Sequence, residues 1–203
     1  MTDPLHRLRL FVSAGTDLEA EHEAIGWVVA QIPAPSLGWA IGRTPRRGEP
    51  HFVAWDDVAS ADFFVLILGR DIKAPVGVEL LAARRAGKKV QAYRKNVRRT
   101  QAAEAFAREA AVDWTVYDAP HQVARLVQMS LVEAILALGP ARGLSPVERD
   151  ALRGFLGRLH HGEQEMSTLE EEGGAGGGGV ILVPGKDLPP GGVLVDDRRE
   201  SAE

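Results

Sequence analysis

The sequence predicts an α/β fold in which a parallel sheet is covered by helices on both faces, giving three layers. Short apolar segments of strand length alternate along the chain with longer segments whose apolar residues recur at helical spacing, and turn-forming residues fall between them. Alternating strands and helices of this kind are joined by right-handed crossovers, which make neighbouring strands parallel. A chain of 203 residues accommodates one such domain with an appendage.

The chain begins with a predicted strand and helix. Residues 8–12 are almost continuously apolar, which is typical of a strand buried on both faces of a parallel sheet. Thr16 to Glu19 fit a capping box, in which a threonine caps the start of a helix and a glutamate three residues later caps it in return. We therefore expect a helix that starts at Thr16 and ends before Pro33.

The next segments include the predicted centre of the sheet. We expect a short second strand over 37–41, a loop over 43–50 because of its prolines and glycine, and a short helix over 55–59. Residues 61–69 contain the clearest buried strand of the chain.

The second half of the chain repeats this alternation. Its periodicity predicts helices over 77–86, 100–110 and 119–138, and strands over 89–93 and 114–117. All five segments belong to the same predicted sheet and its covering helices.

A separate helix follows a break at residues 139–144. Ser145, Pro146 and Glu148 occupy the N-cap, first and third positions of a well-marked helix start. This helix carries one apolar stripe, which needs a partner from this chain or from another. The stripe consists of Leu152, Phe155, Leu156 and Leu159.

These elements divide the chain into three predicted parts. Residues 1–139 form the α/β domain, 140–172 a linker and an amphipathic helix, and 173–203 a glycine-rich linker with a short β-prone tail. The apolar segments 180–183 and 193–195 of the tail are compatible with a hairpin, with a strand added to a sheet edge, or with disorder in isolation.

The composition excludes several classes of chemistry. The absence of cysteine excludes disulfides, thiolate metal sites and a cysteine nucleophile, and it fits a reducing compartment. The N-terminus lacks the basic and apolar regions of a signal peptide, and no apolar run approaches the ~20 residues of a membrane span. We therefore expect a soluble, cytoplasmic protein without membrane contacts.

The charge pattern argues against nucleic acid as a partner. The formal net charge is -4, but nine Lys or Arg residues occur between Arg84 and Arg108. A solvated helix face is the favoured explanation, and nucleic acid, a phosphorylated ligand and the acidic C-terminal region are the alternatives. The sequence contains no zinc, calcium or Walker-type motif, so we expect no metal site.

The candidate ligand-binding residues follow two predicted strands. Because parallel strands end at one edge of a sheet, the residues after 8–12 and after Leu68 are expected to face one cleft. Backbone amides at the predicted helix starts, with nearby positive charge, would hold a ribose, a phosphate or another anion. The candidates are Ser13, Ala14, Gly15, Thr16, Arg70, Asp71, Lys73 and Gly77.

Glu79 is the candidate catalytic residue. A glutamate beside an N-ribosyl bond can stabilise the oxocarbenium ion that forms as the base departs, or can attack it to form a covalent intermediate. A structural explanation is equally compatible with the sequence, because a carboxylate at a helix start interacts favourably with the helix dipole, by about 0.3–1 kcal/mol.

Two segments resemble a known superfamily. They are Arg9-Leu10-Phe11-Val12-Ser13-Ala14-Gly15-Thr16-Asp17-Leu18-Glu19 and the stretch to Val90 that begins Gly77-Val78-Glu79-Leu80. The first resembles the opening of an uncharacterised bacterial family related to TIR domains. The second resembles a segment shared by TIR-like domains and nucleoside deoxyribosyltransferases. The likeness runs from about Leu8 to Leu138 and implies a flavodoxin-like or TIR-like fold.

The resemblance implies that Glu79 acts on a glycosidic bond and that the protein serves bacterial signalling or defence. The segment Lys73–Val78 lacks the serine and cysteine that usually precede this glutamate in NAD-cleaving TIR domains. Three functions therefore stay open: an N-glycosidase, hydrolase or transferase acting on NAD or a nucleotide; a noncatalytic interaction module that self-associates or binds a protein through its 146–160 helix; and a nucleotide sensor. None requires a cofactor, since NAD or the nucleotide is the substrate or ligand.

Overall fold

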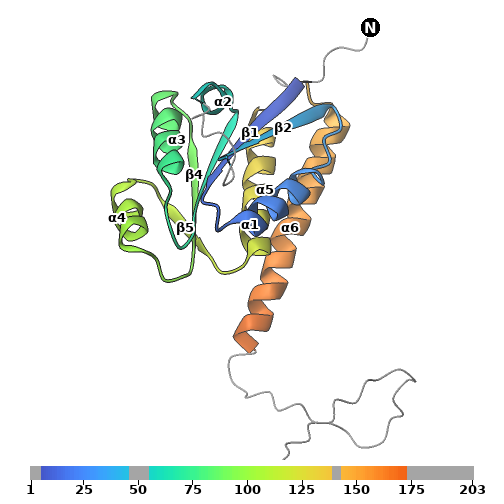
Figure 1. The fold of residues 1–203 in the computed structure, drawn as a ribbon. Helices are drawn as coiled ribbons and strands as arrows, with labels where there is room; N and C mark the ends of the chain where they lie inside the picture. Colours follow the sequence, from blue (N-terminus) through green and yellow to red (C-terminus); the bar gives the residue numbers. More distant parts are fainter. Residues whose placement is uncertain (1–5, 46–54, 139–142, 173–203) are drawn as a thin grey trace, which may run out of the picture. The chain divides into compact units, whose positions relative to one another are not determined.

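The computed structural model confirms the α/β fold (Figure 1). It describes residues 6–45, 55–138 and 143–172, so the predicted tail and most of the loop predicted over 43–50 lie outside the described residues. The elements are β1 (His6–Ala14), α1 (Glu19–Val29), β2 (Leu37–Arg43), α2 (Trp55–Ser60), β3 (Phe63–Leu68), α3 (Ala74–Arg85), β4 (Val90–Lys95), α4 (Gln101–Glu109), β5 (Trp114–Tyr117), α5 (Pro120–Leu138) and α6 (Pro146–Glu172).

The five strands form one parallel sheet in the order β2-β1-β3-β4-β5. This is the strand order of flavodoxin-like folds. The chain passes from β1 outward to β2, then crosses back to β3 on the other side of β1 and continues to β5. The reversal makes β1 and β3 the switch point, where the connections leave in opposite directions and open a crevice at the carboxyl ends of the strands.

Alternate side chains of β1 supply the two faces of the core, because successive strand residues point to opposite sides of a sheet. Leu8, Leu10 and Val12 pack with residues of α1 and α5 on one face. On the other face Phe11 packs with residues of α2 and α3, and its ring stacks on that of Phe64 with 6.0 Å between the centroids. The sheet is therefore the middle of three layers.

The capping box predicted at Thr16 is wrong. The N-cap of α1 is Leu18, which makes no side-chain cap, and the chain turns at Thr16 and Asp17 before the helix starts. In this turn the Leu18 amide donates to the Gly15 carbonyl at 3.2 Å. The Asp17 carboxylate instead accepts a hydrogen bond from the backbone of Arg70, a tertiary contact that the local pattern did not reveal.

Helix α3 begins at Ala74, three residues before the predicted start at Gly77. Lys73 is the N-cap, and Pro75 lies in the first turn, where a missing N–H costs nothing. Glu79 is thus the sixth residue of the helix and lies in its second turn. Because the dipole effect falls off within the first turn, the dipole does not account for a glutamate at this position.

The helix start predicted at Ser145 is confirmed. The Glu148 amide donates to Ser145 Oγ at 3.2 Å, and the Ser145 amide donates to Glu148 Oε2 at 3.0 Å. Leu152 is fully buried in the same core as α1 and α5, and Phe155 packs against that core. The apolar stripe of α6 therefore has a partner in this chain.

The contacts of the chain separate residues 1–165 from residues 166–203. The first unit contains the sheet, its covering helices and the larger part of α6. Of the second unit the structure describes only residues 166–172, the end of α6. No helix within the described segments is long and apolar enough to cross a membrane.

Candidate ligand-binding site

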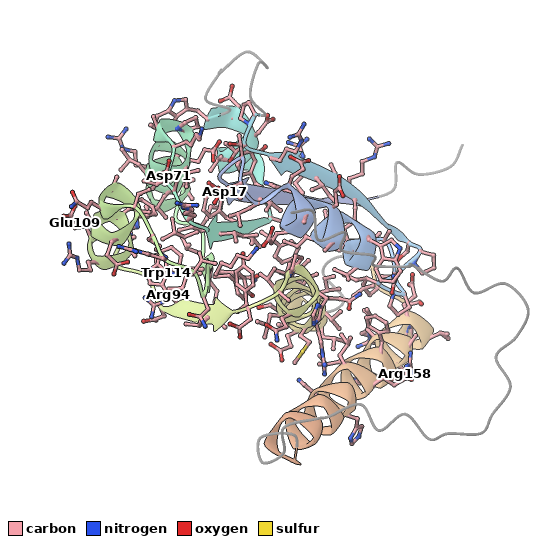
Figure 2. All side chains as sticks on the ribbon, turned by 60° about the horizontal axis from the view of Figure 1, so that its bottom comes forward. Asp17, Asp71, Arg94, Glu109, Trp114 and Arg158 are labelled. Carbon is pink, nitrogen blue, oxygen red and sulfur yellow. The ribbon has the colours of Figure 1, made fainter. Side chains whose placement is uncertain are left out.

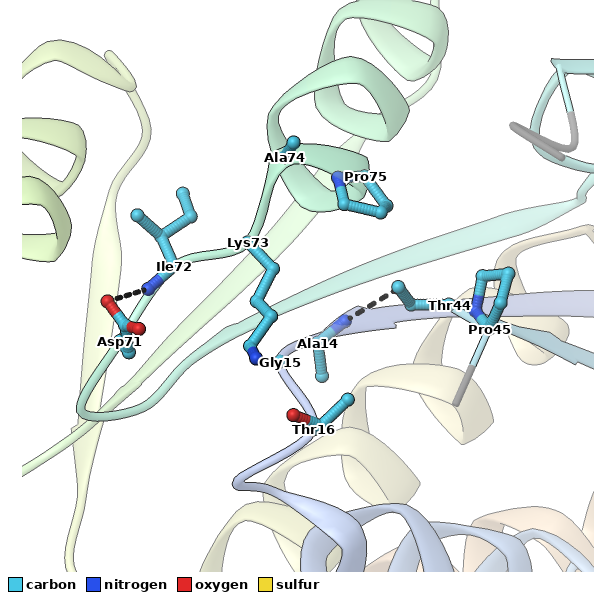
Figure 3. A pocket seen from close by; sticks show the side chains of 10 residues that line it. All are labelled: Ala14, Gly15, Thr16, Thr44, Pro45, Asp71, Ile72, Lys73, Ala74 and Pro75. Carbon is cyan, nitrogen blue, oxygen red and sulfur yellow. Dashed lines mark hydrogen bonds between the residues drawn. The ribbon is translucent and has the colours of Figure 1, made fainter. Parts of the chain in front are cut away.

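A cavity of about 400 Å³ lies at the carboxyl ends of β1, β2 and β3 (Figure 3). This is the switch-point crevice at which open α/β sheets bind ligands, and its volume lies within the ~300–1,000 Å³ of small-molecule sites. The lining combines several apolar side chains with a few polar ones. It consists of Ala14, Gly15, Thr16, Thr44, Pro45, Asp71, Ile72, Lys73, Ala74 and Pro75.

Glu79 is held by two hydroxyl groups next to this cavity. Ser13 Oγ and Thr44 Oγ1 each donate to Glu79 Oε2 over 2.6 Å. Ser13 faces α3 because its partner in the β1–β3 register is Leu66, which packs in the core between the sheet and α3. Thr44 directly follows β2, and its Oγ1 accepts the Ala14 amide at 3.1 Å (Figure 3). Strands β1 and β2 and helix α3 thus meet at one carboxylate.

The Glu79 carboxylate is fully buried and does not line the cavity. Its second oxygen, Oε1, has no hydrogen-bond partner among the residues that the structure describes. Burial raises the pKa of the Glu79 carboxyl, and the hydrogen bonds from Ser13 and Thr44 oppose this shift. A buried carboxylate oxygen without a hydrogen bond lowers the stability of the folded protein, so Glu79 is a candidate for a functional role.

The structure brings together most of the predicted ligand-binding residues. Those that line the cavity are Ala14, Gly15, Thr16, Asp71 and Lys73. The remaining three do not line it: Ser13 is fully buried against Glu79, Arg70 is exposed, and Gly77 lies within α3.

Sequence reasoning missed Thr44 and Pro45. The second strand was predicted to end at residue 41, so Thr44 was assigned to a loop, whereas β2 continues to Arg43. A threonine directly before a proline at a strand end was the available signal, since the residue before proline favours extended backbone.

The Asp17 carboxylate lies across the ends of β1 and β3. Its Oδ2 accepts the Arg70 amide at 2.9 Å. A Cβ added at Gly15 would lie 2.5 Å from Asp17 Oδ1, and one added at Gly69 would lie 2.4 Å from Asp17 Oδ2. Both glycines therefore make room for this carboxylate, which lies at the same end of the sheet as Asp71 (Figure 2).

Asp71 is positioned by the loop before α4. Its Oδ1 accepts the Thr100 hydroxyl at 2.8 Å and the Ile72 amide at 2.9 Å. The Thr100 hydrogen bond and then the Ile72 amide hold the pKa of Asp71 below its usual range. Asp71 therefore presents a negative charge at the cavity.

The helix starts offer less to an anion than the sequence predicted. The first turn of α1 carries Glu19 and Glu21. At the start of α3, Pro75 has no N–H, and the Val76 amide already donates to the Lys73 carbonyl at 3.1 Å. The Lys73 side chain, which extends from the start of α3 toward Gly15 and Thr16 in Figure 3, is the cation of the described lining.

Several side chains of the basic segment hold the fold together. Arg84 donates to the Ala110 and Ala111 carbonyls, Lys88 Nζ donates to the Ala61 carbonyl, and Lys95 pairs with the buried Glu21. Arg84, Lys88 and Lys95 of the basic segment are thus committed to contacts within the chain. No group of three or more metal-ligating side chains occurs in the described part of the chain.

Comparisons with protein-family models, with curated proteins and with solved structures find no match for this chain.

Proposed function

We propose that this protein is a TIR-like module that binds a nucleotide in the cavity at the ends of β1, β2 and β3. The observation that carries the proposal is the position of this cavity, since the crevice between β1 and β3 is where flavodoxin-like sheets bind ligands. The resemblance of the segment that contains Glu79 to TIR-like domains supports a signalling or defence role in bacteria.

The chemistry of the lining supports a nucleotide of modest charge. Pro45, Ile72 and Pro75 offer apolar surface to a base, and Thr16 and Thr44 offer hydroxyl groups to a sugar. Lys73 supplies one positive charge for a phosphate, whereas Asp71 opposes the accumulation of negative charge. This balance favours a mononucleotide, or one half of a dinucleotide, over a triphosphate.

Cleavage of an N-glycosidic bond is the second candidate function. It is favoured by the Glu79 carboxylate, which is held by two hydroxyl groups and keeps one oxygen without a partner among the described residues. In this reaction the bond from C1′ to the base nitrogen breaks, the base leaves with the electron pair, and water or an acceptor base completes the transfer. Binding ranks first because Glu79 is fully buried and outside the cavity lining.

Self-association through the 146–160 helix has less support. Leu152 lies in the core of this chain, so the apolar stripe of α6 does not require a second chain to bury it. Among the side chains of α6 that the structure describes, up to residue 162, Val147 at the start of the helix is a large apolar one that is 78% exposed.

A nucleotide panel tests both functions. NAD, AMP, ATP and inorganic phosphate would be titrated calorimetrically into the native chain, and the same mixtures would be separated by chromatography after long incubation at high protein concentration. We expect AMP or NAD to bind in preference to phosphate, and ATP to bind more weakly than AMP. If no nucleotide binds, the proposal is wrong.

Substitution of Glu79 separates binding from cleavage. Release of free base by the native chain but not by Glu79→Gln would establish an N-glycosidase that depends on this residue. Glu109→Gln is the matched control, because Glu109 is an exposed carboxylate at the end of α4, away from the cavity lining. Binding without base release would establish the nucleotide-binding module.

A further inference from the structure

Thr44 connects the buried Glu79 carboxylate to the cavity. Among the described residues it is the one that both hydrogen-bonds to Glu79 and lines the cavity. Ser13, which makes an equal hydrogen bond to the same oxygen, is fully buried and absent from the lining. Thr44 is therefore the described residue through which Glu79 is hydrogen-bonded to the wall of the cavity.

The bonds of this hydroxyl determine what it offers to a ligand. A threonine hydroxyl has one hydrogen and two acceptor lone pairs. Its hydrogen is committed to Glu79 Oε2 at 2.6 Å, and one lone pair accepts the Ala14 amide at 3.1 Å. These two bonds leave the Thr44 hydroxyl with one lone pair and no hydrogen for a further partner. Donation to the carboxylate polarises the hydroxyl, which makes its oxygen a better acceptor.

We propose that Thr44 is a specificity-determining residue that accepts a hydrogen bond from an O–H or N–H group of the ligand. This inference rests on the proposed function, since it requires a nucleotide in the cavity. A ligand acceptor at the same place would meet a second acceptor and lose its bond to water without replacement. Nucleotides carry suitable donors both on the ribose and on the amino group of adenine.

Titration of AMP into the full chain and its Thr44 variants tests this inference. Thr44→Ser keeps the hydroxyl and should bind AMP within about threefold of the native chain. Thr44→Val keeps the shape, removes the acceptor and should weaken binding by about tenfold, because the ligand donor is left unpaired. If the valine variant does not unfold cooperatively, Thr44→Ala takes its place.

Three AMP analogues distinguish a ligand contact from a structural role, and also identify the donor. The 2′-deoxy form, the 3′-deoxy form and purine riboside 5′-monophosphate each lack one donor group of the ribose or base. With one of the three, the native chain and Thr44→Val should bind equally well, because the group that contacts Thr44 is missing. Ser13→Ala, which removes the other hydroxyl bond to Glu79, should change the affinity for AMP and for every analogue by the same factor.

Three results would overturn the inference while nucleotide binding stands. The first is an equal affinity of the native chain and Thr44→Val for AMP. The second is a loss of the same size for AMP and for all three analogues, and the third is a native chain that binds NAD but not AMP. If nothing in the nucleotide panel binds, the proposed function fails with it.

Discussion

The carboxylate of Asp17 accepts a hydrogen bond of 2.9 Å from the backbone N–H of Arg70, fifty-three positions later in the chain. This bond joins the turn after β1 to the segment after β3, and both segments contribute to the cavity lining. The space for the carboxylate is provided by Gly15 and Gly69, where an added Cβ would approach it to 2.5 and 2.4 Å. The position of the Asp17 carboxylate at this end of the sheet thus requires glycine at both residue 15 and residue 69.

Gly15→Ala is expected to destabilise the protein by about 1–3 kcal/mol, the usual cost of forcing an extra group into a filled space. The new methyl group would displace the Asp17 carboxylate from Arg70. In an Asp17→Ala background the same change should cost less than about 0.5 kcal/mol, since the next nearest atom lies 3.5 Å away. The coupling between the two positions is measured by urea unfolding of the native chain, Gly15→Ala, Asp17→Ala and the double variant.

Gly26→Ala is the matched control for this cycle. A Cβ at Gly26 meets nothing within 4 Å, and alanine is favoured over glycine inside a helix by about 0.5–1 kcal/mol. We therefore expect this variant to be more stable than the native chain. An unchanged stability of Gly15→Ala beside a stabilised Gly26→Ala would contradict the close approach of Asp17.

Glu79→Gln is expected to gain stability relative to the native chain as the pH rises. The folded-state pKa of Glu79 is raised above its usual value of 4.5, so the stability that this group contributes is complete below 4.5 and is lost as the pH rises through the folded-state pKa. Glutamine does not titrate. Unfolding free energies of the two chains measured from about pH 4 to pH 8 should diverge in favour of the variant, and a difference that stays constant over this range would contradict the raised pKa of Glu79.

Glu148→Gln is expected to show the opposite dependence on pH. Hydrogen bonds from Ser36 and then Ser145 lower the pKa of Glu148 to about 2 from a usual value of 4.5. Its contribution to stability is therefore present above 4.5 and is lost as the pH falls through about 2. The native chain should exceed the variant in unfolding free energy at neutral pH, and the two should converge in acid. A constant difference across this range would contradict the role of the ionised carboxylate.

Leu152→Ala is expected to cost about 2–4 kcal/mol, as for a buried leucine whose removal leaves a cavity. Leu152 is fully buried in the core shared with α1 and α5. Val147→Ala, at an exposed position of the same helix, should change the unfolding free energy by less than about 0.5 kcal/mol. Loss of the far-UV signal in one transition would show that α6 unfolds with the sheet. A neutral Leu152→Ala would contradict the packing of α6 on this core.

The order of the helices and strands was predictable because the apolar pattern and the capping residues of each element lie within that element or next to it. The apolar run at 61–69 was predicted as the central strand, and β3 is buried along its whole length. The start of α6 was predicted correctly from Ser145 and Glu148, since both capping bonds lie within one turn. The same type of pattern at Thr16 does not cap a helix. The carboxylate of the next residue, Asp17, accepts a hydrogen bond from the amide of Arg70, two residues after the end of β3, and α1 begins only at Glu19.

The α/β class, the succession of strands and helices, and the region of the candidate site could be predicted from the sequence, because periodicity and local capping depend on residues close together in the chain. The place of Thr44 in the cavity lining, the burial of Glu79 and the bond from Asp17 to the Arg70 amide could not be predicted in this way. These relationships arise from hydrogen bonds between residues 35 to 66 positions apart. No local pattern encodes such bonds, since they form only when the sheet brings the strand ends together.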